Sequence, residues 1–305
     1  MIDYKDLKTE MRNSASTNLD LMSTAQILNL FYEEDKKLIE SVKAEHETLG
    51  GIIEKAFECV RGGGRIFYVG AGTSGRLGVL DASEIKPTFG IKKKIFIGII
   101  AGGRTALTNS VEGAEDIKDD SVKQLKKYKF GASGKKDMVI GVTASGVTPF
   151  VLGALEYAKT SNCANALITC NMAVKNSYAG QFDQIAALAV GSEIVSGSTR
   201  LKSGTATKMA LNMISTTVMI KLGKVYENYM VDLTPSCKKL VERGCRILME
   251  LCKIDRAEAG ELLQRAGMNV KTAILMHEKS LTLKEAVKLL KKNDGYLRRA
   301  ISELK

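Results

Sequence analysis

Glycines and hydroxyl side chains gather in one short stretch, residues 70–75, which reads Gly-Ala-Gly-Thr-Ser-Gly. An apolar run at 66–69 precedes it and predicts a buried strand, and helical apolar spacing follows it. A strand, a glycine turn and a helix N-terminus together bind anions, because the glycines let the backbone approach and free N–H groups point at the ligand. The sequence therefore predicts an anion site formed by Gly72, Thr73, Ser74 and Gly75.

The same stretch satisfies G-x-G-x-x-G, the spacing of dinucleotide-binding loops, but that spacing alone is a weak signal. A dinucleotide site also needs an acidic residue about 20 positions further on, at the end of a second strand. Residues 92–104 hold lysines, apolar residues and glycines instead. A bare turn is the remaining alternative, but such a turn does not need Thr and Ser packed among its glycines.

Two further loops repeat the mixture of small and hydroxyl residues, at 143–149 and at 191–200. Such loops follow the C-terminal ends of parallel strands, where ligands bind. The same hydroxyls could instead cap helices, and the sequence leaves both functions open. The recurrence of the pattern favours a phosphate bound without a metal. The candidate residues of the first of these loops are Thr143, Ser145, Gly146 and Thr148, with Pro149 in the first helical turn.

Carboxylates are the candidates for proton transfer, because the chain has only two histidines, both in polar helical contexts. Asp81 and Glu84 lie three residues apart on a predicted helix that we expect to end at Pro87. Glu112 and Glu115 have the same spacing on a helix predicted after the second strand. Most helix carboxylates are simply solvated. Two carboxylates beside a phosphate site can act as acid and base if their different environments give them different pKa values.

The elements that must position these residues alternate between strands and helices. Short apolar runs predict five strands, at 66–69, 94–101, 137–143, 166–170 and 185–190. Helix-length segments separate most of them, which predicts an α/β fold: a doubly wound parallel sheet in a three-layer, flavodoxin-like sandwich.

Beyond about residue 239 the pattern changes to short charged helices, which predicts a small C-terminal helical domain. At the other end, residues 1–20 are polar and irregular, and a terminal tail of this kind is usually disordered unless it docks. We therefore divide the chain into an N-terminal tail and helices (1–55), an α/β domain with the predicted phosphate site (56–225) and a helical domain (238–305).

Composition limits the possible partners. The 305 residues carry a net charge of +11, but the lysine-rich runs are scattered and lack the aromatic interleaving of single-strand nucleic-acid sites. The six cysteines show no zinc-like spacing, and no apolar run is long enough to cross a membrane. The charged N-terminus shows no signal peptide. We expect a cytoplasmic protein with reduced thiols that binds neither nucleic acid nor membranes.

In long motifs spread through nearly the whole chain, the sequence resembles the N-acetylmuramic acid 6-phosphate etherases. The motifs lie at 12–16, 22–24, 70–84, 111–116, 143–146, 197–202 and 223–226. The resemblance implies the sugar-isomerase (SIS) fold and cleavage of the D-lactyl ether at C3 of N-acetylmuramic acid 6-phosphate. Opening of the sugar ring exposes an aldehyde that acidifies the C2 proton. Elimination of D-lactate and addition of water then give N-acetylglucosamine 6-phosphate.

The resemblance also implies roles for individual residues. Glu84 is the proton donor to the departing lactate, Glu115 is the second acid or base, and Ser198 joins the binding residues. No metal or redox cofactor is implied. A homodimer is expected, in keeping with a Met-rich helix at about 202–223. Val147 stands where the family usually has arginine, and the loss of an arginine weakens anion contacts.

A second departure follows Glu84, where the family usually continues with cysteine and two prolines. Here Ile85 and Lys86 replace the cysteine and the first proline, and only Pro87 remains.

Two other functions stay open. A regulator of the same fold would bind a sugar phosphate without turnover, although the presence of both Glu84 and Glu115 argues against it. An aldose–ketose phosphate isomerase would need no acid for a leaving group. Release of lactate separates the etherase from both.

Overall fold

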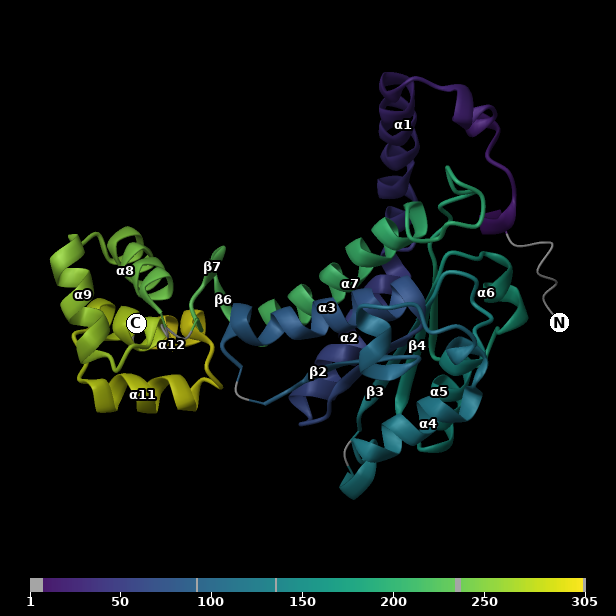
Figure 1. Ribbon diagram of the computed structural model, residues 1–305. Coiled ribbons are helices and arrows are strands. Elements are labelled where there is room, and N and C mark those ends of the chain that lie inside the picture. The colour runs from purple at the N-terminus through teal and green to yellow at the C-terminus, as the bar shows by residue number, and fades with distance from the viewer. Residues whose placement is uncertain (1–7, 92, 135, 234–236, 304–305) are drawn as a thin grey trace. The chain divides into compact units, whose positions relative to one another are not determined.

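The computed structural model describes residues 8–91, 93–134, 136–233 and 237–303 (Figure 1). Its central sheet has five parallel strands in the order β2-β1-β3-β4-β5. The strands are β1 (Ile66–Gly70), β2 (Phe96–Ile100), β3 (Met138–Thr143), β4 (Ala164–Thr169) and β5 (Gln184–Ala187). Each coincides with a predicted apolar run, so the predicted α/β fold with a parallel sheet is confirmed.

Helices cover both faces of this sheet, which is why nearly every strand residue is buried. Phe67 and Val69 pack in one cluster with Phe150 and Leu155 of α5. On the opposite face Tyr68 meets α3, where a Cβ added to Gly78 would lie 2.9 Å from the Cβ of Tyr68. The helices of this part are α1 (Thr24–Lys43), α2 (His46–Arg61), α3 (Gly72–Phe89), α4 (Lys118–Lys127), α5 (Pro149–Thr160), α6 (Ala173–Ser177) and α7 (Lys202–Lys221).

Local sequence features define the start of α1 and the end of α2, whereas α3 departs from its prediction. Ser23 and Gln26 form the reciprocal hydrogen bonds of a capping box before α1, and α2 ends at Gly62. The expected stop at Pro87 is wrong, because α3 continues to Phe89. A proline removes only its own N–H bond, and the last turn of a helix tolerates that loss better than its middle does.

The helix predicted after β2 is also wrong. The chain there forms two short 3₁₀ turns, η5 (Gly103–Leu107) and η6 (Ala114–Asp116). Gly102, Gly103 and Gly113 adopt φ values of +78°, +65° and +72°, which are incompatible with a right-handed helix. Glu112 and Glu115 therefore do not share a helix face.

Residues 8–21 dock on the sheet-containing part instead of forming a loose tail, while residues 1–7 lie outside the described residues. They form three short 3₁₀ turns, η2 (Lys8–Glu10), η3 (Ser14–Ser16) and η4 (Leu19–Leu21). The N–H of Gly197 donates to the carbonyl of Thr9 at 3.1 Å. Further along, the Asn13 amide donates to Glu34 at 2.9 Å.

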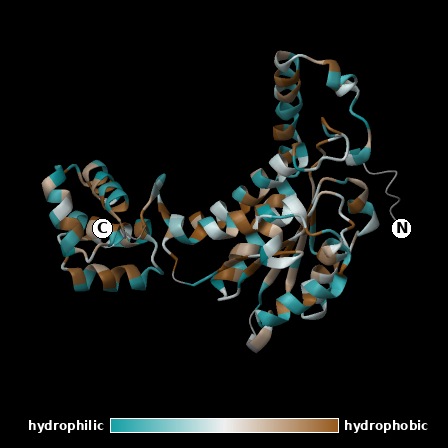
Figure 2. Ribbon diagram, in the orientation of Figure 1, coloured by the Kyte–Doolittle hydropathy of each residue, from teal (hydrophilic) through white to brown (hydrophobic). Residues whose placement is uncertain are grey.

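The C-terminal helices form a cluster with its own core, as predicted. Buried residues of this core include Cys245, Leu248, Leu263, Ile274 and Leu275. The elements are the hairpin β6 (Val225–Tyr226) and β7 (Tyr229–Met230), then α8 (Lys238–Cys252), α9 (Arg256–Arg265), α10 (Val270–Lys279), α11 (Leu283–Lys292) and α12 (Leu297–Glu303). The helices of both parts of the chain carry hydrophobic as well as hydrophilic residues (Figure 2).

Contacts divide the chain into two compact units. The chain passes from one to the other between Ser83 and Glu84, returns between Lys94 and Ile95, and passes again between Ser215 and Thr216. The division of the chain into separately folding parts at 1–55, 56–225 and 238–305 stays a prediction. No helix in the described ranges has both the length and the apolar composition to cross a membrane.

Candidate functional site

A cavity of about 240 Å³ opens where β1 and β3 end. The β1–α3 turn, the β3–α5 turn, η6 and the docked N-terminal segment all contribute to its wall. Among the residues expected from the sequence, those that line it are Gly72, Thr73, Ser74, Glu115, Thr143, Ser145 and Thr148. The structure thus brings residues of all three predicted loops, Thr199 standing for the third, and one predicted carboxylate to one place.

The β3–α5 turn uses its hydroxyls on one another and leaves a helix N-terminus uncapped. Thr143 Oγ1 lies 2.7 Å from Thr148 Oγ1 and 3.3 Å from Ser145 Oγ. Thr148 is the N-cap residue of α5, yet its side chain accepts no hydrogen bond from the helix. Free N–H groups at a helix start attract anions. The capping alternative therefore fails for Thr148, and its hydroxyl lies beside a cavity suited to a phosphate.

The glycines of the first loop have different tasks. Gly72 has φ +50° and lines the cavity, where an added Cβ would meet nothing within 4 Å. Gly75 does not line it. A Cβ there would lie 2.6 Å from Ile100 Cγ1 and 2.7 Å from the Gly70 oxygen, so this glycine lets α3 approach the sheet. Gly146 likewise shapes its turn, with φ +78° and a would-be Cβ 2.3 Å from Val174.

Glu115 is the predicted acid–base residue that reaches the cavity. It lies on η6, held near the two loops by the buried Ala114. Burial raises the pKa of Glu115, and the neighbouring carboxylates of Asp116 and Glu112 raise it further. A raised pKa makes the carboxylate a stronger base. It also brings the pKa closer to neutral pH, which suits proton transfer.

A smaller cavity of about 140 Å³ adjoins the first and shares Ala71, Gly72 and Glu115 with it. Arg76 lines this second cavity. Its Nε donates to the Leu107 carbonyl at 3.3 Å, and its Nη2 donates to the Asn109 carbonyl at 2.9 Å. The guanidinium therefore fixes the loop before η6 while offering positive charge beside Glu115.

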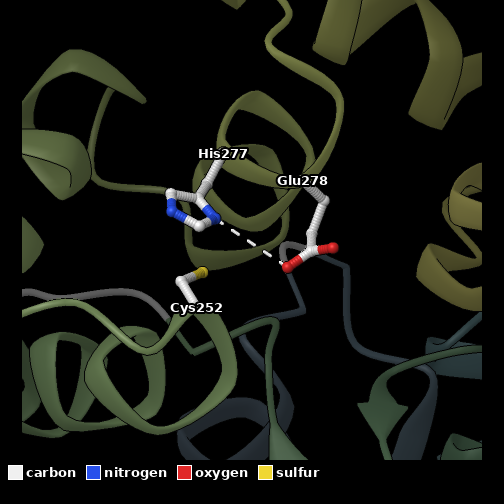
Figure 3. A group of neighbouring side chains, drawn as sticks. All are labelled: Cys252, His277 and Glu278. Carbon is white, nitrogen blue, oxygen red and sulfur yellow. Dashed lines mark ion pairs between the residues drawn. The ribbon is translucent and has the colours of Figure 1, made fainter.

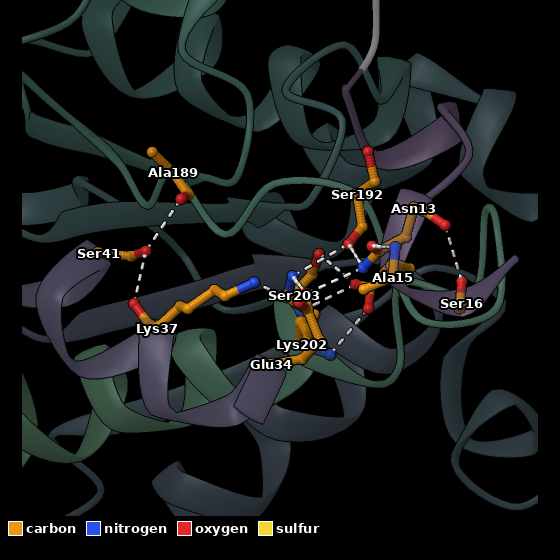
Figure 4. A network of polar contacts seen from close by, with 11 residues as sticks. Asn13, Ala15, Ser16, Glu34, Lys37, Ser41, Ala189, Ser192, Lys202 and Ser203 are labelled. Atoms are coloured by element: carbon orange, nitrogen blue, oxygen red, sulfur yellow. Dashed lines mark hydrogen bonds and ion pairs between the residues drawn. The ribbon is translucent and has the colours of Figure 1, made fainter. Parts of the chain in front are cut away.

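A buried polar network fixes the loop that leads into α7 (Figure 4). Lys202 Nζ pairs with Glu34 Oε2 at 2.5 Å, and both side chains are only 3% exposed. Glu193 accepts hydrogen bonds from the backbone N–H groups of Lys202 and Ser203, at 2.9 Å each. Burial alone would raise the pKa of Glu34, but hydrogen bonds from Lys202, Lys37 and Asn13 lower it to about 2. The network ties α1, the N-terminal segment and α7 together.

Four polar lining residues were not among the predicted site residues: Thr9, Glu10, Asp116 and Thr199. Asp116 and Thr199 belong to stretches that carry the family resemblance, at 111–116 and 197–202. Membership of those stretches was the signal by which the sequence could have shown them. Only the tertiary structure shows that the N-terminal segment reaches the cavity.

Comparison with known proteins shows the family of this chain. An N-acetylmuramic acid 6-phosphate etherase of Klebsiella aerogenes is 44% identical over 99% of this chain and 99% of that protein. One from Lactobacillus johnsonii is 45% identical over 96% of this chain and 97% of its own length. The chain belongs to the N-acetylmuramic acid 6-phosphate etherase family.

This etherase-family chain also carries the SIS fold. The model of the glucokinase regulatory protein N-terminal SIS domain matches residues 48–159. A phosphoheptose isomerase from Francisella tularensis superposes with a TM-score of 0.50 at 18% identity, covering 65% of this chain and all of that one. At this identity the likeness concerns the fold alone.

Besides Gly75 and Gly146, two predicted site residues of this etherase-family chain do not line the cavity. Ser198 is one, although its neighbour Thr199 does line it. Glu84 is the other: it is exposed on α3, twelve residues beyond Gly72. A helix rises 1.5 Å per residue, which corresponds to about 18 Å along its axis between these positions. Glu84 is therefore not among the residues that line the cavity with Glu115.

Among the described residues, one group could in principle ligate a metal: Cys252, His277 and Glu278 of the C-terminal helices (Figure 3). Their donor atoms lie within 4.8 Å of one another. Metals bind the thiolate, yet burial, together with Glu278, raises the pKa of Cys252 to about 11. We assign this group to the packing of α8 against α10, apart from the catalytic chemistry.

Proposed function

We propose that this chain is a carbon–oxygen lyase that cleaves the D-lactyl ether of N-acetylmuramic acid 6-phosphate. The products are N-acetylglucosamine 6-phosphate and D-lactate, a step in the catabolism of cell-wall amino sugars. The observation that carries the proposal is the cavity in which Glu115 lies beside two hydroxyl-rich turns, one of them before the uncapped start of α5. Family membership over nearly the full length supports it. Sugar phosphates are highly charged and are retained inside cells, so we place the reaction in the cytoplasm.

The phosphate binds to the two turns. Thr143, Ser145 and Thr148 donate from one turn, and Thr73 and Ser74 donate from the other. The N-termini of α3 and α5 add backbone N–H groups and positive potential. These donors need no bound metal to hold a phosphate. Val147 replaces the arginine usual at its position, so the phosphate depends on hydroxyl and backbone donors there.

Proton transfers follow once the sugar ring has opened. The aldehyde at C1 acidifies the C2 proton, and Glu115 removes it, because its raised pKa makes it an effective base. Glu84 protonates the departing lactate oxygen at C3. Water then adds at C3, with the two carboxyl groups exchanging roles. This assignment needs no redox cofactor.

We further propose that the working form is a homodimer in which a second copy brings Glu84 to the cavity. Within one chain Glu84 is exposed and lies about 18 Å along α3 from Gly72. Leu80 on the same helix and Met213 on α7 are 47% and 44% exposed, and they offer an apolar surface that a partner would cover.

One competing function has a specific observation behind it. The match to a regulatory-protein SIS domain is compatible with a chain that binds sugar phosphates without turning them over. Such a protein would keep the phosphate turns but would not need Glu115 to carry a raised pKa.

The test is D-lactate release from N-acetylmuramic acid 6-phosphate by the wild type, Glu84→Gln and Glu115→Gln. Lactate from the wild type, with strong losses in both variants, is expected. Mixing the two inactive variants tests the shared site, because a dimer of one of each regains one intact cavity. Sugar-phosphate binding without lactate from the wild type would leave the regulator as the answer.

A further inference from the structure

The etherase reaction contains a proton transfer that neither Glu84 nor Glu115 performs. N-acetylmuramic acid 6-phosphate is a cyclic hemiacetal, and its C2 proton becomes acidic only after the ring opens to the aldehyde. Opening moves one proton from the O1 hydroxyl to O5 while the C1–O5 bond breaks. A positioned carboxyl group accelerates such transfers, because it can accept one proton and return another.

Glu10 is a carboxylate in the same cavity that the reaction as described leaves without a task. It comes from the N-terminal segment, whereas Glu115 comes from η6, so the two reach the ligand from different elements. Within the described residues, no hydrogen bond or ion pair joins the Glu10 carboxylate to a protein group. Its negative charge makes it unsuited to bind the phosphate, which leaves the sugar as its target.

The position of Glu10 is built into the fold. Thr9 beside it is 2% exposed, and its carbonyl accepts a hydrogen bond from the Gly197 N–H at 3.1 Å. Gly197 has φ +75°, and a Cβ added there would lie 2.9 Å from Glu10 Oε2. The carboxylate thus lies directly against the turn that carries Thr199 into the cavity. Asn13 anchors the segment again, through Glu34 and the Ser192 carbonyl.

We propose that Glu10 is a catalytic residue that opens the sugar ring. One oxygen of its carboxylate accepts the O1 proton, the C1–O5 bond breaks as the C1 carbonyl forms, and O5 takes a proton from the same carboxyl group. The step is balanced, since one proton moves from O1 to O5 and Glu10 ends in its starting state. This inference rests on the proposed function, because it concerns the same substrate.

Interconversion of α and β anomers measures ring opening separately from lactate release. In a Glu115→Gln background the ether stays intact, so the protein should bind N-acetylmuramic acid 6-phosphate and still accelerate exchange between its anomeric protons, followed by NMR. Adding Glu10→Gln should reduce this acceleration roughly 100-fold, within the range that a single acid–base group supplies. Binding measured by calorimetry should change less than threefold. Glu10→Asp should restore part of the exchange.

Glu33→Gln is the matched control, because Glu33 is an exposed α1 carboxylate whose partner is Lys36. It should leave exchange unchanged, and thermal unfolding should show that all variants fold. Exchange in the Glu10→Gln background as fast as in its parent would overturn the inference, and so would a tenfold loss of binding, which would make Glu10 a binding group only. If the wild type releases no lactate but Glu10→Gln still slows anomer exchange, the ring-opening role of Glu10 is supported and the etherase function is refuted.

Discussion

The cavity beside β1 and β3 and the polar network around Lys202 use the same kinds of side chain in opposite ways. In the network, Glu34 accepts hydrogen bonds from Lys202, Lys37 and Asn13, and its pKa falls to about 2. In the cavity, no described cation pairs with Glu115, and burial beside two further carboxylates raises its pKa. A carboxylate with all its partners supplied by the protein holds elements in place. A carboxylate that the protein leaves without partners is available to a substrate.

Glu115→Gln gives the largest effect expected from this comparison. Removing the base should reduce D-lactate release about 1,000-fold, within the range for a positioned acid–base group. The melting temperature should stay the same or rise slightly, since Glu115 is exposed and its repulsion from Asp116 and Glu112 is lost. Steady-state assays and thermal unfolding measure both. Glu40→Gln, an exposed α1 variant, is the control. Full activity in Glu115→Gln would remove Glu115 from the mechanism.

Lys202→Met tests the other side of the comparison. It leaves Glu34 buried and without its buried cation, with only the exposed Lys37 still paired to it, which should cost about 3–5 kcal/mol of the free energy of unfolding. Urea unfolding measures the loss. Replacing both partners, in Glu34→Gln with Lys202→Met, should recover part of it because no buried charge then remains unpaired. A Lys202→Met protein as stable as wild type would show that the network does not fix these elements.

The pH dependence of the network follows from its lowered pKa. A carboxyl group with a depressed folded pKa stabilises the fold above its unfolded pKa, and that stability is lost as the pH falls through the folded value. For Glu34 the loss should occur between about pH 4.5 and pH 2. Urea titrations across this window should show a smaller loss for Glu34→Gln than for wild type.

Asp81 adds a third case, a buried carboxyl with too few partners. It accepts a hydrogen bond from Ser215 at 3.0 Å, while its Oδ2 and the Tyr68 hydroxyl are buried without a partner among the described residues. Burial raises its pKa from 3.8 to about 6, so its ionisation should weaken the fold as the pH rises through that interval. The free energy of unfolding of Asp81→Asn, relative to that of wild type, should therefore be about 3 kcal/mol higher at pH 8 than at pH 3.5. Equal stability differences at both pH values would contradict this.

Thr148→Val gives the smallest effect. It removes one hydroxyl donor from the phosphate turn and should raise KM about tenfold with little change in kcat, because a hydrogen bond to a charged group contributes about 1.5–3 kcal/mol. Thr160→Val is the control, since Thr160 lies at the other end of α5 and its hydroxyl donates to the Tyr157 carbonyl. A fall in kcat with unchanged KM would mean that Thr148 acts in the chemical step instead.

The sequence by itself determined the strands, the glycine turn and the chemistry of the two hydroxyl-rich loops. Buried parallel strands appear as short apolar runs, and Gly72, Thr73 and Ser74 are neighbours along the chain, so local pattern was enough to find them. The family resemblance supplied Glu115 in the same way, through a motif that is contiguous in sequence.

Only the tertiary structure decided which of these residues meet. It excluded the helix after β2 because three glycines there take positive φ, and it left Glu84 exposed and not among the residues that line the cavity with Glu115. It also brought Glu10 to the cavity across more than a hundred residues of sequence. Such contacts depend on how loops and termini pack on a finished sheet, and the short-range patterns of apolar and polar residues carry no record of that packing.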